Sequence, residues 1–414
     1  MGSFVAVLAF FATLTSTVAV LLDGKLCYTV FPDALPGIFE DLSAFATSRI
    51  TAAHVDAMRV KLMTGGTHLA HDGVGITVID NVVYVEAHVE AIGGWPHLTA
   101  ATYATTLHRM TKRYALPDVT FFVSTSDHSD QFVDEGTLRS GELSLPIMRA
   151  CKTWDSPTVL LPTYALWEHN AWVYANKSDS FADPELKQVE WEARENVVFT
   201  AYTPLSTASD GQLTTRYNER GQKDMDVRAT LTRFGNESDA RTWRVKPLLN
   251  SRHEDIHKWG RYKYIAHVTG VTCSNKLEKI ALLGSTLLLE EEGYVSTLQR
   301  ILRPWVSYVP FYRFLPQELR DRVNWLDDNP DVAKRIAEAT QTAVRHYHTM
   351  RGVECQLLVL LREYSKLQTF APRDVRVPAQ LPYREFMLAC FVREFHGDGA
   401  KLDAWEKALF HDPS

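Results

Sequence analysis

The sequence lacks the signatures of several common classes of protein. Its five cysteines are widely spread, and no Cys-x-x-Cys pair or Cys/His cluster indicates a zinc site. The net charge of −6 indicates no general affinity for polyanions, so nucleic acid is not an expected partner. Heptads, internal repeats and low-complexity tracts are missing too. With 414 residues, 45% of them apolar, the chain is long enough for two globular domains.

The N-terminal segment lacks a basic flank but is strongly apolar. Phe4 to Leu22 contains no charged residue and is close to the length that spans a bilayer. Residues 1–23 can be an uncleaved signal anchor or a signal peptide cleaved near Ala19. Both interpretations predict a chain in the ER or Golgi lumen, and the anchor predicts a single-pass type II membrane protein. That compartment permits disulfides, and Cys355 with Cys390 is the predicted pair.

The stretch from Tyr262 to Leu289 carries the clearest structural pattern. An apolar run to Val268 is followed by a polar turn, a helical pattern closed by Gly284, and a second apolar run. Strand, turn, helix and strand in this order form the unit of a parallel α/β sheet. Backbone N–H groups at the helix N-terminus, together with Lys276, can hold a phosphate, but an ordinary βαβ crossover has the same pattern.

The remaining elements continue this alternation and predict two α/β lobes facing one cleft. We expect a hairpin at 76–85 that turns at Asp80-Asn81, helices at 36–63, 98–114, 184–195, 331–348, 355–367 and 383–395, and strands at 118–125 and 197–204. The predicted units are an N-terminal lobe at 24–190, a C-terminal lobe at 191–370 and a helical tail at 371–414.

Four segments, in this order, resemble the CAP10-type glycosyltransferases, glycosyltransferase family 90. They are KYIAHVTGVTCSNKLEKIALLGSTLL, LRPWVSYVPF, WLDDNPDVAKRIAEA and CQLLVLLREYSKL. The resemblance implies two Rossmann-like lobes of the GT-B type, one for the acceptor and one for the nucleotide sugar. It implies an inverting transfer of glucose or xylose from UDP-glucose or UDP-xylose to a hydroxyl of a protein or glycan acceptor. No metal or other cofactor is expected under this scheme.

The resemblance also implies roles for individual residues. Asp127 follows a buried strand and stands where the family has its presumed catalytic base, although such a polar cluster is more often a plain turn. Trp167 and Glu168 resemble a segment beside the acceptor cleft, although aromatic residues of this kind are usually core. The implied UDP-sugar-binding residues are Thr200, Arg216 (with Arg220 as the alternative), Gly270, Val271, Thr272, Cys273, Ser274 and Lys276.

Two departures from the family pattern leave the activity open. Residues 199–202 read Phe-Thr-Ala-Tyr where the family usually has an aromatic residue followed by Arg-Gly-Ser, and Lys276 replaces a common Arg. Altered donor choice, weaker activity and a catalytically inactive lumenal binding protein are all consistent with these changes. Asp224 and Asp226 form a DxD triplet, which would bind a metal in a different transferase architecture but is weak evidence in a polar loop.

Overall fold

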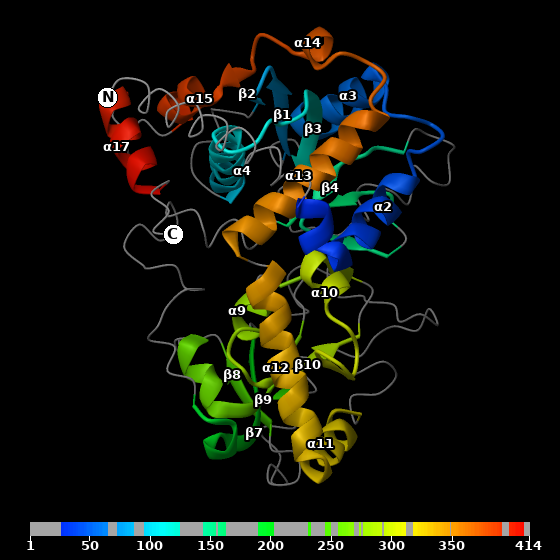
Figure 1. The fold of residues 1–414 in the computed structure, drawn as a ribbon, viewed down its shortest axis with the longest axis vertical. Helices are drawn as coiled ribbons and strands as arrows, with labels where there is room; N and C mark the ends of the chain where they lie inside the picture. The colour runs from blue at the N-terminus through cyan, green and yellow to red at the C-terminus, as the bar shows by residue number, and fades with distance from the viewer. Residues whose placement is uncertain are drawn as a thin grey trace, which may run out of the picture.

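The chain folds into two α/β lobes, one above the other in Figure 1. The computed structural model describes residues 26–64, 73–86, 95–124, 144–154, 156–162, 189–202, 231–232, 245–249, 256–268, 273–274, 276–291, 294–311, 318–347, 349–390 and 397–409. This mixed α/β architecture with two main sheets is consistent with the predicted fold class of two α/β lobes.

The first lobe is built on a mixed sheet of six strands. Their order is β13 (Leu381–Pro382), β2 (Val82–Glu86), β1 (Gly73–Ile79), β3 (Val119–Ser124), β4 (Met148–Arg149) and β6 (Val159–Leu160). Only β3, β4 and β6 pair in parallel, whereas β13, β2, β1 and β3 pair antiparallel. This half of the molecule is therefore not a purely parallel Rossmann-like sheet.

The second lobe is built on a wholly parallel sheet of five strands. Their order is β12 (Val309–Phe311), β10 (Thr286–Glu290), β9 (Tyr262–His267), β7 (Glu195–Tyr202) and β8 (Val245–Leu249). After β7, the chain forms β8 on one side of β7. It then forms β9 on the other side of β7, followed outward by β10 and β12. This reversal is that of a doubly wound sheet, and its switch point lies between β7 and β9.

Helices cover both sheets and return the chain to the first lobe. Those of the first lobe are α2 (Leu35–Ser43), α3 (Ala52–Arg59) with a π-helical turn at Val60–Thr64, and α4 (Trp95–Thr111). Those of the second are α9 (Lys276–Ile280), α10 (Thr297–Ile301), α11 (Glu318–Asp328) and α12 (Pro330–Tyr347). The chain then crosses back through α13 (Met350–Leu367), and α14 (Pro372–Val375), α15 (Tyr383–Cys390) and α17 (Gly399–Leu409) follow in the upper lobe (Figure 1).

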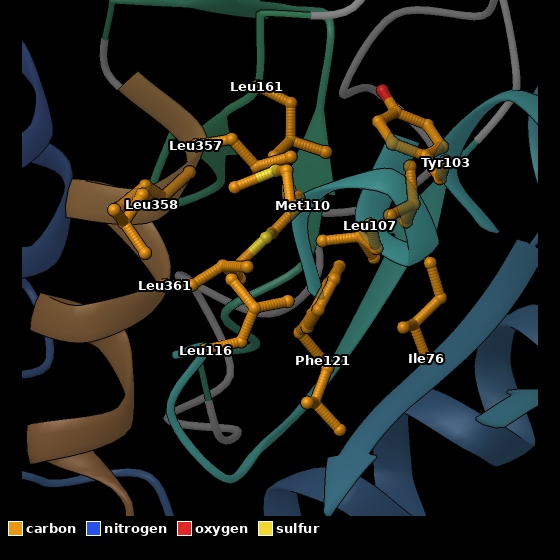
Figure 2. Packing of buried hydrophobic residues seen from close by; sticks show 14 of the residues in the cluster. Ile76, Tyr103, Leu107, Met110, Leu116, Phe121, Leu161, Leu357, Leu358 and Leu361 are labelled. Atoms are coloured by element: carbon orange, nitrogen blue, oxygen red, sulfur yellow. The ribbon is translucent and has the colours of Figure 1, made fainter. Parts of the chain in front are cut away.

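The core of the first lobe lies between α4, α13 and the mixed sheet. Leu107 and Met110 of α4 point toward Leu358 and Leu361 of α13, with Phe121 of β3 below them (Figure 2). All five side chains are fully buried, as the helical spacing of the apolar positions in 98–114 and 355–367 predicts. Although α13 falls inside the range 191–370, it packs with the first lobe, and so does the tail through its helices α15 and α17.

Local patterns located most elements correctly, with two exceptions. The hairpin turn at Asp80-Asn81 is confirmed, and both residues have positive φ, as a two-residue type I′ turn requires. The continuous helix expected at 36–63 is wrong, because the chain turns between α2 and α3, where Arg49 has φ 58°. The helix expected at 184–195 is wrong in its described part, where a single 3-10 turn, Trp191–Ala193, leads into β7.

Two disulfides are present among the described residues, and they correct the predicted pairing. Cys355 is bonded to Cys27 rather than to Cys390, because α13 returns to the N-terminal part of the first lobe. A second bond joins Cys151 to Cys273. Both fit an oxidising compartment such as the secretory pathway. No helix in the described part of the chain is long and apolar enough to cross a membrane, and Phe4 to Leu22 lies outside it.

Candidate functional site

The topology of the second sheet identifies one edge as the place for a ligand. All five strands are parallel, so their carboxyl ends lie along the same edge, with β7 ending at Tyr202 and β9 at His267. Open α/β sheets bind ligands outside the carboxyl ends of their strands, where the strand order reverses. The candidate site is therefore the region past the ends of β7 and β9.

Lys276 brings a positive charge to this switch point. It is the first residue of α9, and its Nζ donates a hydrogen bond to the carbonyl oxygen of Ala201, near the end of β7, at 2.8 Å. The contact links the helix after β9 to the neighbouring strand across the switch. Lys276 therefore lies where its charge can offset a phosphate, and part of its hydrogen-bonding capacity is already used by Ala201.

Thr200 precedes Ala201 on β7, but its side chain is enclosed by the protein. Its side chain is fully buried, and its Oγ1 has no hydrogen-bond partner among the described residues. A buried hydroxyl without a hydrogen-bond partner destabilises the fold by about 1–3 kcal/mol. A polar ligand group that forms a hydrogen bond with the Thr200 hydroxyl would remove this cost. Contact with a ligand would first require displacement of the atoms that cover Thr200.

Cys273 and Ser274 hold the start of α9. The backbone N–H of Cys273 donates to Cys151 Sγ at 3.0 Å, beside the disulfide between the two residues. Ser274 Oγ accepts a hydrogen bond from the backbone N–H of Lys276 at 3.4 Å. The N–H of Cys273 is thus directed at sulfur, so this donor is not directed at an anion.

The ligand edge of the second sheet faces the first lobe. The chain leaves the carboxyl end of β10 and forms β11 (Tyr294–Ser296), which pairs antiparallel with β5 (Cys151–Thr153) of the first lobe. Cys151 lies opposite Ser296 in this pairing. The two lobes are therefore joined by strand pairing and a disulfide beside the candidate site.

A buried ionic cluster completes this junction. Asp41 Oδ1 of α2 accepts a hydrogen bond from Lys152 Nζ of β5 at 2.6 Å and forms an ion pair with Arg300 Nη2 of α10 at 2.8 Å. The exposed fractions of the three side chains are 2%, 4% and 10%. The other carboxylate oxygen of Asp41 accepts the N–H of Leu160 at 2.8 Å. Both oxygens of the carboxylate are satisfied, as a buried charge requires.

Several predicted site residues lie outside the described part of the chain. They are Asp127, Trp167, Glu168, Arg216, Gly270, Val271 and Thr272, together with the DxD residues Asp224 and Asp226. The strand expected before Asp127 is present as β3, which ends at Ser124. Among the described residues, no cluster of His, Cys, Asp or Glu could hold a metal ion.

Sequence reasoning missed the residues that join the lobes and two buried residues at the ligand edge. Asp41, Lys152 and Arg300 carry no motif, and contact between them depends on strand pairing between distant segments. His267 and Glu290, at the ends of β9 and β10, are almost fully buried. The only available signal for these two was their position at the end of an apolar run, where open α/β sheets place polar site residues.

A cation at the switch point of a doubly wound sheet, beside a second α/β lobe, is typical of proteins that bind nucleotides or other phosphorylated ligands. Comparison with known proteins identifies the particular family. The chain belongs to glycosyl transferase family 90, whose model matches residues 29–395.

Curated relatives of this chain include protein O-glucosyltransferases. The chain is 24% identical over 305 residues to protein O-glucosyltransferase 2 of Danio rerio, covering 73% of this chain and 57% of the relative. It is 22% identical over 264 residues to protein O-glucosyltransferase 1 of Homo sapiens, covering 62% and 64%. It is 26% identical over 235 residues to an O-glucosyltransferase rumi homolog of Aedes aegypti, covering 54% and 56%. The chain thus spans between half and two thirds of the length of these relatives.

Proposed function

We propose that this protein is an inverting glycosyltransferase that moves glucose or xylose from a UDP-sugar to a hydroxyl of a protein or glycan acceptor. Membership of glycosyl transferase family 90 supports the reaction class. The observation that carries the donor site is the hydrogen bond from Lys276 to Ala201, which puts a cation at the switch point of the parallel sheet.

The proposed arrangement is that of a GT-B-type enzyme. The second lobe holds the UDP-sugar with Lys276 and the backbone between Gly270 and Ser274, and Thr200 and Arg216 adjoin it. The first lobe supplies Trp167 and Glu168 to the acceptor. The pairing of β5 with β11 supports this assignment, because it turns the carboxyl edge of the second sheet toward the first lobe.

In the proposed reaction, the acceptor oxygen forms a bond to the anomeric carbon as the bond from that carbon to UDP breaks. The bonding electron pair leaves on the phosphate oxygen of UDP, and the acceptor proton passes to the carboxylate of Asp127. Asp127 would act as the general base, a role that contributes roughly 10²- to 10⁴-fold in rate. Lys276 would offset the negative charge that develops on UDP, and no metal is required.

The test measures UDP release from UDP-glucose and from UDP-xylose, with mass spectrometry of the acceptor. Asp127→Ala should lower the turnover number about 10²-fold or more, while UDP still binds. Asp321→Ala is the control, because it removes an exposed carboxylate on α11. Equal turnover by wild type and Asp127→Ala would remove Asp127 from the mechanism.

A second candidate is a lumenal binding protein that kept the fold and lost the reaction. It is favoured by the sequence Phe-Thr-Ala-Tyr at 199–202, which lacks the basic, glycine and serine residues of the family pattern, and by the burial of Thr200. Calorimetry with UDP separates the two. Absence of binding at millimolar UDP would favour this candidate, whereas loss of activity in EDTA would favour a metal-dependent enzyme that uses Asp224 and Asp226.

The proposed location is the lumen of the ER or Golgi. Two disulfides support an oxidising compartment. Residues 1–23 would attach the chain to the membrane as a type II anchor if they are not cleaved. N-terminal sequencing of the protein isolated from membranes distinguishes an anchor from a removed signal peptide.

A further inference from the structure

The disulfide between Cys151 and Cys273 connects the two lobes at the candidate donor site. Cys151 begins β5 of the first lobe, and Cys273 lies just before α9 of the second, 122 residues further along the chain. The other disulfide, between Cys27 and Cys355, lies within the core of the first lobe. The two bonds therefore hold different parts of the molecule together.

The segment that begins α9 is fixed on two sides. On one side, Cys273 is bonded to Cys151, and its N–H also donates to Cys151 Sγ at 3.0 Å. On the other side, Lys276 donates to the carbonyl of Ala201 at 2.8 Å. Helix α9 has only five residues, so its own hydrogen bonds hold its first turn weakly. These outside contacts therefore set the position of the segment.

The partner of this segment in the first lobe is itself rigidly placed. Cys151 lies in β5, which pairs with β11, and the next residue, Lys152, is held by the buried Asp41. Arg300 of α10 joins the same carboxylate. The disulfide thus connects the start of α9 to a fixed point in the junction rather than to a loose loop.

We propose that the Cys151–Cys273 disulfide is a positioning element for donor binding. It holds the start of α9, and with it Lys276, against the first lobe, so that the phosphate-binding groups are ordered before the nucleotide arrives. This inference rests on the proposed function of the same site. A site that is ordered in advance binds more tightly, because the entropy of ordering is not lost on binding.

Loss of the disulfide should weaken UDP binding without unfolding either lobe. Fixing the backbone of a residue costs conformational entropy, so release of even one residue near Lys276 affects the affinity for UDP. We expect about a tenfold increase in the Kd for UDP, which corresponds to about 1.4 kcal/mol. Since Cys151 and Cys273 do not touch the reacting atoms in this scheme, turnover at saturating donor should fall less than the affinity.

The experiment compares the double variant Cys151→Ala/Cys273→Ala with the matched variant Cys27→Ala/Cys355→Ala. Peptide mapping of the unreduced wild type should first give the linked peptides of Cys151 and Cys273. A free thiol at either position, or a bond from either one to Cys390, overturns the proposal. Calorimetry with UDP should then show the tenfold loss in the first variant only, at a temperature where both variants are folded by circular dichroism.

Amide hydrogen exchange tests the proposal without a ligand. Residues 276–280 and 294–301 should exchange faster in Cys151→Ala/Cys273→Ala than in wild type and remain protected in the matched variant. Unchanged exchange and unchanged affinity would overturn the positioning role. If wild type does not bind UDP at all, the proposed function fails, while the exchange result still decides whether the disulfide orders the segment. Should the double variant not fold, partially reduced wild type, with alkylation to identify the opened bond, replaces it.

Discussion

Replacement of Asp41 by asparagine tests the buried junction between the lobes. The carboxylate of Asp41 is 2% exposed and lies 2.6 Å from Lys152 Nζ and 2.8 Å from Arg300 Nη2. Asparagine keeps the size of the side chain but removes its charge, so Lys152 loses its buried counter-charge and Arg300 keeps only the exposed carboxylate of Glu40, at 3.7 Å. Lys152 comes from the first lobe and Arg300 from the second, so removal of the Asp41 charge weakens the contact between the two lobes.

The expected cost is about 3–5 kcal/mol, the range for breaking a buried ion pair by removal of one partner. The matched control is Asp403→Asn. Asp403 pairs with Arg384, and their side chains are 58% and 50% exposed. Because water already solvates both of these charges, the control should cost at most about 1 kcal/mol. The difference in the free energy of unfolding between the two variants therefore measures how much burial adds to the cost of losing an ion pair.

The assay is equilibrium unfolding in urea, followed by circular dichroism, with thermal unfolding as a second measurement. Asp41→Asn should lower the midpoint in urea in proportion to the loss of free energy, and lower Tm by roughly 6–20 °C for lobes of this size. A loss no larger than that of Asp403→Asn would refute the reasoning, because it would mean that the cluster is hydrated in solution.

Three further predictions concern the donor site, the acid stability and the hairpin. Lys276→Met should raise the Kd for UDP about 10- to 150-fold in calorimetry, the effect of a hydrogen bond from a charged donor, while Lys276→Arg keeps most of the affinity; a change below twofold contradicts the assignment. Burial and two neighbouring cations lower the pKa of His108 from 6.5 to about 4, so the stability that its neutral ring contributes is complete above pH 6.5 and is lost as the pH falls toward 4. His108→Gln should flatten the dependence of Tm on pH between pH 6.5 and 4, and an unchanged slope would contradict a contribution from His108. Asn81→Ala should cost roughly 2–4 kcal/mol in urea unfolding, because it loses hydrogen bonds to the Thr111 carbonyl and the Leu116 N–H and places alanine at φ 63°, whereas Asn81→Gly should recover only the backbone part.

The sequence alone determined the elements whose signals are local. The unit from Tyr262 to Glu290 could be predicted because the order of apolar run, polar turn and helix, closed by Gly284 at φ 69°, is complete within 30 residues. The hairpin could be predicted for the same reason, since Asp80 and Asn81 tolerate positive φ. The sequence also located Lys276 at the start of a helix after a strand, and thereby the candidate donor site.

Only the tertiary structure decided which distant segments meet. Cys27 bonds Cys355 across 328 residues, and no periodic pattern distinguishes that partner from Cys390. The return of α13 to the first lobe, the pairing of β5 with β11 and the contact of Asp41 with Arg300 are of the same kind. Periodicity reports which face of an element is buried, whereas the choice of partner depends on the order of strands in a sheet and on the packing of whole lobes. The physical reason is that these contacts are selected by the free energy of the complete fold, to which each local segment contributes only its own part.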